Sequence, residues 1–236
     1  MAEIAGNSGS VTYAAGYTTN AHAWRITDGG VVWDRTPFGP TGNARVRAFG
    51  VADWSGEYRC WLPGTLNTDL TLAGGFYSTN AHSYSITVTS EDLPTTPFGV
   101  DYVTRIAGLN EASGSYACYI DSGVALPQRG STDTLTLTLD VGLTYSFNIL
   151  VESVDVGVAA DGGEREITVN FQSTGDITEG AVPIISTTGA ATFVAQGARQ
   201  YSGTILVTSI GISMTAERDA AEYTIGFVGD GDLVAA

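Results

Sequence analysis

The chain has 236 residues, 43% of them hydrophobic and 15% charged, which suits a globular protein of one large or two small domains. Its formal net charge is −15, and all ten of its basic residues are arginine. An acidic surface repels phosphate backbones, so this composition argues against a protein that reads DNA or RNA sequence.

The N-terminal segment MAEIAGNSGS has neither a basic region nor an apolar run. We therefore expect no secretory signal, and synthesis in a cytoplasm. No stretch approaches the roughly 18 consecutive apolar residues of a membrane-spanning helix. Thirty glycines and many Thr, Ser and Val residues favour short strands joined by tight turns, and no window keeps a helical apolar period. The chain is predicted to be all-β, with little helix.

Two copies of one pattern follow the N-terminus. The matching segments are TTNAHAWRIT (18–27) with STNAHSYSIT (78–87), TPFG (36–39) with TPFG (96–99), and RAFGVADWSGEYRCWL (47–62) with RIAGLNEASGSYACYI (105–120). The first two matches share an offset of 60 and the third has an offset of 58, which indicates a two-residue deletion. We call residues 11–62 and 71–120 the two early halves.

Each early half ends in a segment that resembles part of an immunoglobulin strand, SGEYRC (55–60) or SGSYAC (113–118). An immunoglobulin domain needs two cysteines, one on each sheet. Here Cys60 and Cys118 occupy equivalent repeat positions, and neither copy supplies a second thiol. We therefore predict two buried thiols without a disulfide, and set the immunoglobulin interpretation aside.

A second, different pattern is repeated in the last third of the chain. Residues 145–177 align without a gap to residues 201–233 at an offset of 56, and each copy alternates apolar and polar residues as two strands of a hairpin. We call these copies the late halves. The segment TEGAVPIISTTGAA (178–191) is interpreted as a linker with turn chemistry.

The four halves follow one another as early, early, late, late. The short connection SGVALPQRGSTD (122–133) predicts that the second early half packs with the first late half, because short connections join spatial neighbours. This gives an inner module of residues 65–178 and an outer module of residues 1–64 and 179–236. The expected fold is a pair of β-sandwich or partly closed barrel modules built from duplicated halves.

The repeated motifs resemble those of siphophage major tail proteins, which form the tail tube. The resemblance lies in IAGNSGSVTYAAG (4–16), NAHAWRIT (20–27), TPFG (36–39) and FGVADWSGEYRCWL (49–62), and in the closing segments YSGTILVTSIGIS (201–213) and VNFQSTGDI (169–177). The repeat-motif residues that carry it are Trp24, Phe38, Trp54, Gly56, Tyr58, Phe98, Gly114, Tyr116, Phe171 and Phe227. They are interpreted as structural residues of tail-tube-like modules.

The resemblance implies a structural protein of a bacteriophage virion, made in the host cytoplasm, that associates with itself and with other virion proteins. Tail-tube rings of this family have six-fold symmetry, so a chain with two modules would form a homotrimer that mimics a hexamer, or a hexamer. DNA would pass through the ring without specific binding, past acidic residues on one sheet face. No membrane contact is expected.

No catalytic, cofactor-binding or metal-binding site is predicted. His22 and His82 stand in the same repeated NAH context, without a nearby nucleophile, which favours a hydrogen bond at a strand end. The acidic segment GDGDL (229–233) lacks the remaining ligands of a calcium loop and is interpreted as a solvated turn. We expect no enzyme activity.

Two other functions remain open at this point. One is a capsid decoration (cement) protein with the same fold, whose trimers would clamp neighbouring shell subunits. The other is a receptor- or carbohydrate-binding β module of the virion. Rings or tubes under the electron microscope would favour the tail-tube interpretation over both.

Overall fold

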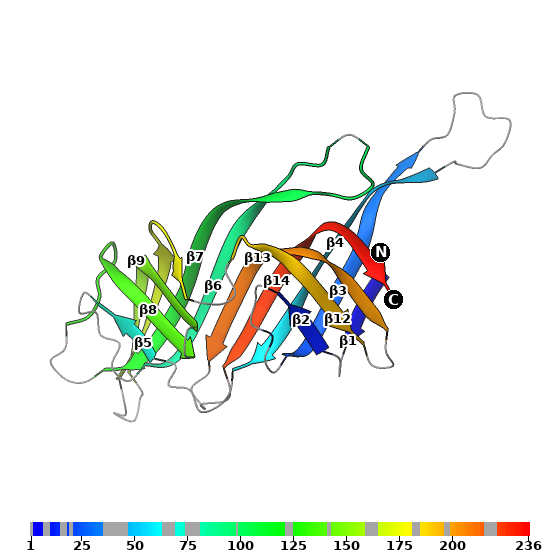
Figure 1. The fold of residues 1–236 in the computed structure, drawn as a ribbon. Helices are drawn as coiled ribbons and strands as arrows, with labels where there is room; N and C mark the ends of the chain where they lie inside the picture. The colour runs from blue at the N-terminus through cyan, green and yellow to red at the C-terminus, as the bar shows by residue number, and fades with distance from the viewer. Residues whose placement is uncertain are drawn as a thin grey trace.

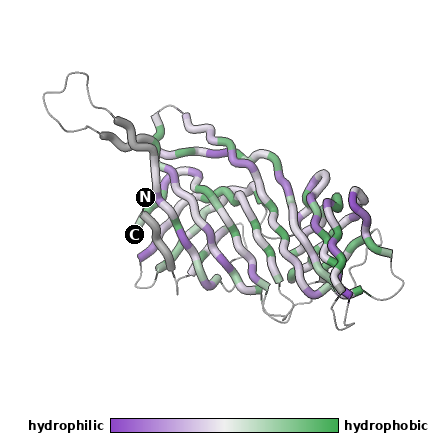
Figure 2. Tube along the Cα trace, turned by 180° about the vertical axis from the view of Figure 1, so that it is seen from behind, coloured by the Kyte–Doolittle hydropathy of each residue, from purple (hydrophilic) through white to green (hydrophobic). Residues whose placement is uncertain are grey.

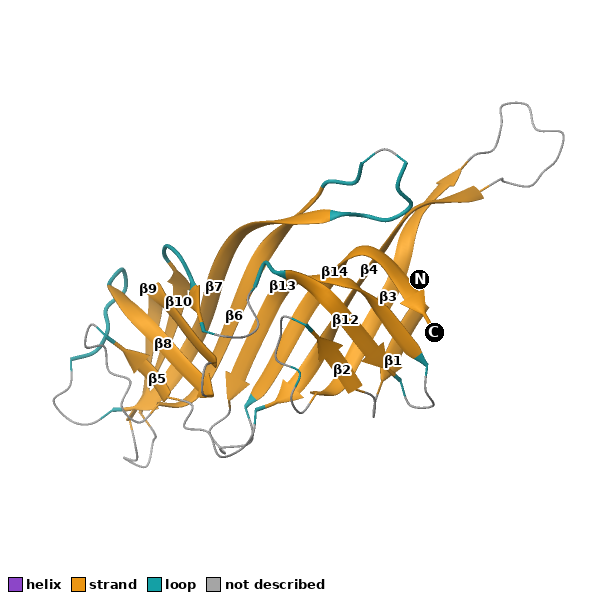
Figure 3. Ribbon diagram, viewed as in Figure 1, coloured by secondary structure: helices purple, strands orange, loops and turns teal. Residues whose placement is uncertain are grey.

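The computed structural model describes residues 2–6, 10–14, 18, 21–34, 47–62, 69–73, 81–97, 99–120, 125–140, 143–158, 165–180, 185–195, 199–214 and 221–236. At residues 2–6, 31–34, 47–50, 69, 140 and 158 only the backbone is described. The described part of the chain forms strands, turns and loops, with no helix (Figure 3). It therefore contains no helix able to cross a membrane. The fold is all-β, as predicted.

The strands, in chain order, are β1 (Ala2–Gly6), β2 (Ser10–Tyr13), β3 (Ala21–Asp34), β4 (Arg47–Trp61), β5 (Asp69–Leu72), β6 (Ala81–Pro94), β7 (Arg105–Tyr119), β8 (Thr132–Asp140), β9 (Leu143–Val158), β10 (Arg165–Ser173), β11 (Thr178–Glu179), β12 (Thr188–Val194), β13 (Gln200–Met214) and β14 (Glu222–Ala235). Their long path is β1-β3-β4-β14-β13-β6-β7-β10-β9-β8-β5, and all of these neighbours are antiparallel (Figure 1).

Two long strands, β13 and β9, each belong to both layers of a sandwich. β13 pairs with β12 along Gln200–Leu206 and with β6 along Ser209–Met214, so it belongs to two layers. β12 in turn pairs with β2, and together they lie over one end of the long sheet (Figure 1). Phe193 of β12 is fully buried, and its ring lies 5.7 Å from that of Trp24 and 5.2 Å from that of Phe227 in the long sheet. β9, β8 and β5 repeat the arrangement at the other end.

The two early halves form hairpins of the same register. β3 and β4 place Trp24 opposite Tyr58 and Ile26 opposite Gly56, and β6 and β7 place Tyr84 opposite Tyr116 and Ile86 opposite Gly114. Each ladder is interrupted at the histidine, between residues 21 and 23 and between 81 and 83. These shared bulges show that the sequence repeat is also a repeat of the backbone structure.

The late halves match as closely. β10 pairs with β9, and β14 pairs with β13, with Phe171 opposite Val151 and Phe227 opposite Val207. The offset of 56 also relates β8 to β12, since Thr132 lies opposite Leu150 just as Thr188 lies opposite Leu206. The interpretation of residues 178–191 as a linker is therefore wrong in part. They contain β11 and the start of β12, whose Gly189, Ala190 and Ala191 hide the strand signal because such residues have low β-propensity.

We call β2–β4 with β12–β14 the first module, and β5–β10 the second module. β4 pairs with β14 in the first module, and β7 pairs with β10 in the second. One sheet and one hydrophobic cluster run through both modules. The division of the chain at residues 64/65 and 178/179 into separate domains stays a prediction.

Candidate assembly site at the junction of the modules

The repeat-motif residues within the described chain are core residues. Trp24, Trp54, Tyr58, Tyr116, Phe171 and Phe227 are each no more than 3% exposed. Phe38 and Phe98 lie outside the described residues.

Gly56 and Gly114 make room for an aromatic ring on the neighbouring strand. A Cβ on Gly56 would lie 2.2 Å from the carbonyl oxygen of Arg25 and 2.6 Å from Cζ of Phe227. A Cβ on Gly114 would lie 2.3 Å from the carbonyl oxygen of Ser85 and 3.2 Å from Cζ of Phe171. Glycine is needed at both places because real side chains do not approach a backbone oxygen so closely. These motifs therefore build the fold and form no chemical site.

Both cysteines and both histidines have structural surroundings. Cys60 and Cys118 form no disulfide and are fully buried, which raises the pKa of their thiols to about 12 and about 11. The ring of His22 stacks on Trp61 at 4.4 Å, and that of His82 stacks on Tyr119 at 4.2 Å. Nδ1 of each histidine has no hydrogen-bond partner among the described residues, whereas Nε2 of His82 lies 3.2 Å from Oε1 of Glu166. The described contact of His22 is stacking, and His82 adds a contact with a carboxylate.

The junction between the modules is an ordinary antiparallel ladder. Ser209–Met214 of β13 pair with Tyr84–Thr89 of β6, which places Ile212 opposite Ile86 and Gly211 opposite Thr87. Ile210 and Ile212 are buried, and Ile212 lies in the sheet between Ile86 of β6 and Tyr223 of β14. One chain thus contains a built-in contact between two modules of the same construction.

A buried polar pair reinforces the junction beneath the ladder. The hydroxyl groups of Tyr145 in β9 and Tyr223 in β14 lie 2.5 Å apart, and both side chains are buried. Burial raises the pKa of both phenols, so the pair is neutral and one hydroxyl donates to the other. Nearby, the carboxylate of Glu179 accepts a hydrogen bond of 3.0 Å from the Ile185 N–H, and burial raises the pKa of Glu179 to about 7 against the effect of that bond.

The β6–β7 hairpin adds a third contact, since it reaches across to the first module (Figure 1). The Ala52 N–H donates to the carbonyl oxygen of Asp101 (2.8 Å), and the Val103 N–H donates to the carbonyl oxygen of Ala52 (3.1 Å). Arg105, whose side chain is 11% exposed, binds Asp53 at 2.7 Å and also contacts Asp92. Its backbone N–H donates to Oδ1 of Asp230 at 2.9 Å.

The acidic segment GDGDL belongs to this contact. Besides the bond to Asp230, the Trp54 indole N–H donates to the carbonyl oxygen of Gly231 (2.9 Å), and the Gly231 N–H donates to that of Val103 (3.1 Å). Gly231 has a φ of 104°, which favours glycine. The segment is thus a bulge within β14, between Gly229 and Leu233, that contacts the β6–β7 hairpin, and it differs from the solvated turn that we expected.

The open face of the long sheet is mostly neutral and polar. Polar and apolar residues alternate along its strands (Figure 2). The apolar residues are buried, so they form the core face, and the other face is lined mostly by Ser, Thr, Asn and Gln. The charged residues described on this open face include Arg25, Asp53, Glu57, Arg59, Glu111, Asp155, Glu166 and Glu222. Arg59 pairs with Glu57 at 3.2 Å and with Glu222 at 3.5 Å. Among the charged residues of this face, carboxylates outnumber arginines.

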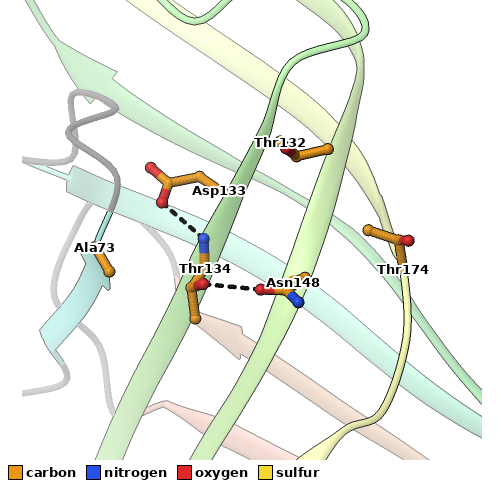
Figure 4. A pocket seen from close by; sticks show the side chains of 6 residues that line it. All are labelled: Ala73, Thr132, Asp133, Thr134, Asn148 and Thr174. Carbon is orange, nitrogen blue, oxygen red and sulfur yellow. Dashed lines mark hydrogen bonds between the residues drawn. The ribbon is translucent and has the colours of Figure 1, made fainter.

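A hollow of about 590 Å³ lies beside β8 and β9 and is lined by Thr132, Asp133, Thr134, Asn148, Ala73 and Thr174 (Figure 4). The Asp133 carboxylate accepts a hydrogen bond from the Thr134 N–H, and the Thr134 hydroxyl donates to Oδ1 of Asn148. These groups can form hydrogen bonds with a polar ligand. The described residues also contain no group of three or more His, Cys, Asp and Glu that could hold a metal ion.

Sequence reasoning missed the junction residues, above all Arg105, Tyr145 and Tyr223. The arginine that begins both RAFG and RIAG could have drawn attention to Arg105. A sequence repeat does not, however, indicate which distant residues such an arginine contacts. Comparison of the chain with family models, curated proteins and solved structures finds no match.

Proposed function

We propose that this chain is a structural protein of a tailed-bacteriophage virion, tail-tube-like, that assembles with itself into a ring or tube around a DNA conduit. The observation that carries the proposal is the junction of two modules with equal strand registers in one continuous sheet. A contact between unlike surfaces of like units is heterologous, and repetition of such a contact generates rings or filaments.

The open face of the long sheet suits a conduit wall. Its neutral hydroxyl and amide side chains and its excess of carboxylates offer little to attract a phosphate backbone. Three copies would supply six modules, which is the trimer that mimics a hexamer. Other virion proteins would contact the two rims of the ring.

Negative-stain electron microscopy of the purified protein, at rising concentration, tests this function. Hollow rings or tubes support it. Compact solid trimers would favour a capsid decoration protein instead, and monomers that bind glycans would favour a receptor-binding module, for which the polar hollow beside β8 is the place to look.

A further inference from the structure

The edge of β9 is open where the same edge of β13 is covered. Ser153–Val158 correspond to Ser209–Met214 at the offset of 56, but no strand among the described residues pairs with their outer edge. Val156 and Ile212 both lie on the core-facing side, opposite Ile167 and Tyr223. Ile212 is 1% exposed, whereas Val156 is 56% exposed. Among the residues that the structure describes, the second module therefore has no strand in the place that β6 takes beside the first.

The strand equivalent to β6 is β3, and its edge is held by β1. Ile4 lies opposite Ile26 and Glu3 opposite Thr27 in that pair. At the junction, Ile212 lies opposite Ile86 and Gly211 opposite Thr87, with the strands running in the same relative direction. Since residues 26 and 86 are equivalent, β1 occupies on β3 the register that β13 occupies on β6.

The sequence of β1 also resembles the free end of β9. Residues 2–6 read AEIAG and residues 154–158 read VDVGV. When both are placed in the junction register, each has an acid in second position, a β-branched apolar residue in third and a small residue in fourth.

We propose that β1 stands in for β9 of a second copy of this chain, and that assembly replaces β1 on β3 of one copy by Val154–Val158 of the next. Asp155 then lies opposite Thr27 and Val156 opposite Ile26. The two strands exclude each other, because an edge offers one row of backbone donors and acceptors. The proposal rests on the proposed function for the presence of a second copy. It makes β1 a guard that protects the edge until a neighbour arrives.

A second surface points to the same neighbour. Ala52, Asp53 and Gly231, on which the β6–β7 hairpin docks, correspond to Asn110, Glu111 and Gly175. These three line a hollow of about 420 Å³ beside Leu109, which is 80% exposed. At one side of the hollow the Ser186 hydroxyl donates to Oδ1 of Asn110. The strands equivalent to β6 and β7 are β3 and β4, so a copy whose β3 pairs with β9 also brings Arg47, the first residue of β4 and the equivalent of Arg105, toward this hollow.

Disulfide cross-linking tests the proposed register. The double variant Thr27→Cys/Asp155→Cys, oxidised mildly with diamide, is expected to give a ladder of covalent oligomers, and each single variant to give none. Thr87→Cys/Gly211→Cys is the matched control, because it places the same pair in the internal junction and should form an intrachain disulfide. The buried native cysteines will not interfere.

A lock on β1 tests the exchange. Glu3→Cys/Thr27→Cys should form an intrachain disulfide that holds β1 on β3 and lowers the assembled fraction about tenfold or more. Reduction should restore assembly, which a misfolded variant would not show. Undiminished assembly of the locked protein would overturn the exchange.

The outcomes separate this proposal from the function on which it rests. Rings or tubes in which the two introduced thiols of Thr27→Cys/Asp155→Cys stay reduced, while the internal control is oxidised, contradict the β9–β3 register and leave the function standing. A cross-linked ladder that never closes into rings or tubes supports the register and contradicts the ring.

Discussion

The two modules share one backbone plan but fill their cores in different ways. In the first module, Trp54 packs where a Cβ on Gly229 would lie 2.1 Å from its Nε1. In the second module, the corresponding residues are Ala112 and Ser173, and the Ala112 N–H donates to Oγ of Ser173 at 2.8 Å. Phe147 replaces Gly203 and supplies a ring 6.2 Å from Phe171, as Trp54 does at 5.9 Å from Phe227.

This difference in core packing accounts for Trp54 in the first early half and for Ala112 at the equivalent position in the second. The aromatic ring that fills this space is supplied by β4 in the first module and by β9 in the second. The β4–β14 and β7–β10 pairs nevertheless have the same register. The second contrast, between buried Ile212 and exposed Val156, is a difference of surroundings and not of packing.

The largest effect on stability is expected at Ile212, and it tests the contrast with Val156. Ile212→Asp places a carboxylate in the junction core and should lower the free energy of unfolding by about 4 kcal/mol or more. Val156→Asp, at the equivalent position, should change it by less than about 0.5 kcal/mol in the monomer. Urea unfolding at a concentration where the chain is monomeric checks both. Equal losses for the two variants would contradict the claim that only one of these edges is covered.

Trp54→Ala should be next, with a loss of about 3–5 kcal/mol because it leaves a cavity in the first module. Gly229→Ser should lower stability by about 1–3 kcal/mol when Trp54 is present, since the new side chain meets the indole. In the Trp54→Ala background the same serine should be tolerated, because it recreates the Ala112–Ser173 pair. Unfolding of the four proteins gives a double-mutant cycle, and additive losses would show that the two modules are not built on interchangeable solutions.

Tyr223→Phe removes a hydroxyl from the buried pair between the modules. We expect a loss of about 1–2 kcal/mol, because the buried Tyr145 hydroxyl loses this partner. Tyr145→Phe/Tyr223→Phe should lose less than the sum of the single variants. Thermal unfolding of all three variants measures the coupling, and no coupling would mean that the hydroxyl groups do not interact.

Stability should also depend on pH. The pKa of Glu179 rises from 4.5 to about 7 on folding, so the folded chain holds a proton that the unfolded chain releases in this range. Stability should therefore fall as pH rises from about 4.5 to about 7. Glu179→Gln should flatten this part of the profile, as measured by urea unfolding at several pH values. An unchanged slope would assign the pH dependence to other carboxylates.

The sequence predicted the all-β fold and both repeats because alternation and self-similarity are local properties that can be read along the chain. It did not reveal β12, whose small residues weaken the alternation, although Ala191 and Phe193 are buried. It also did not reveal the pairing of β13 with β6, or the binding of Asp53 by Arg105. Those contacts join surfaces far apart in sequence, and their strength depends on burial that only the fold creates.

The ladder between β13 and β6 has a mechanical consequence. A hinge between the modules would have to break backbone hydrogen bonds on one side and the grip of the β6–β7 hairpin on the other. The angle between the modules is thus set when the chain folds, before any neighbour is met. If such chains form a closed ring, the fixed angle between the two modules of each chain already constrains the diameter of that ring.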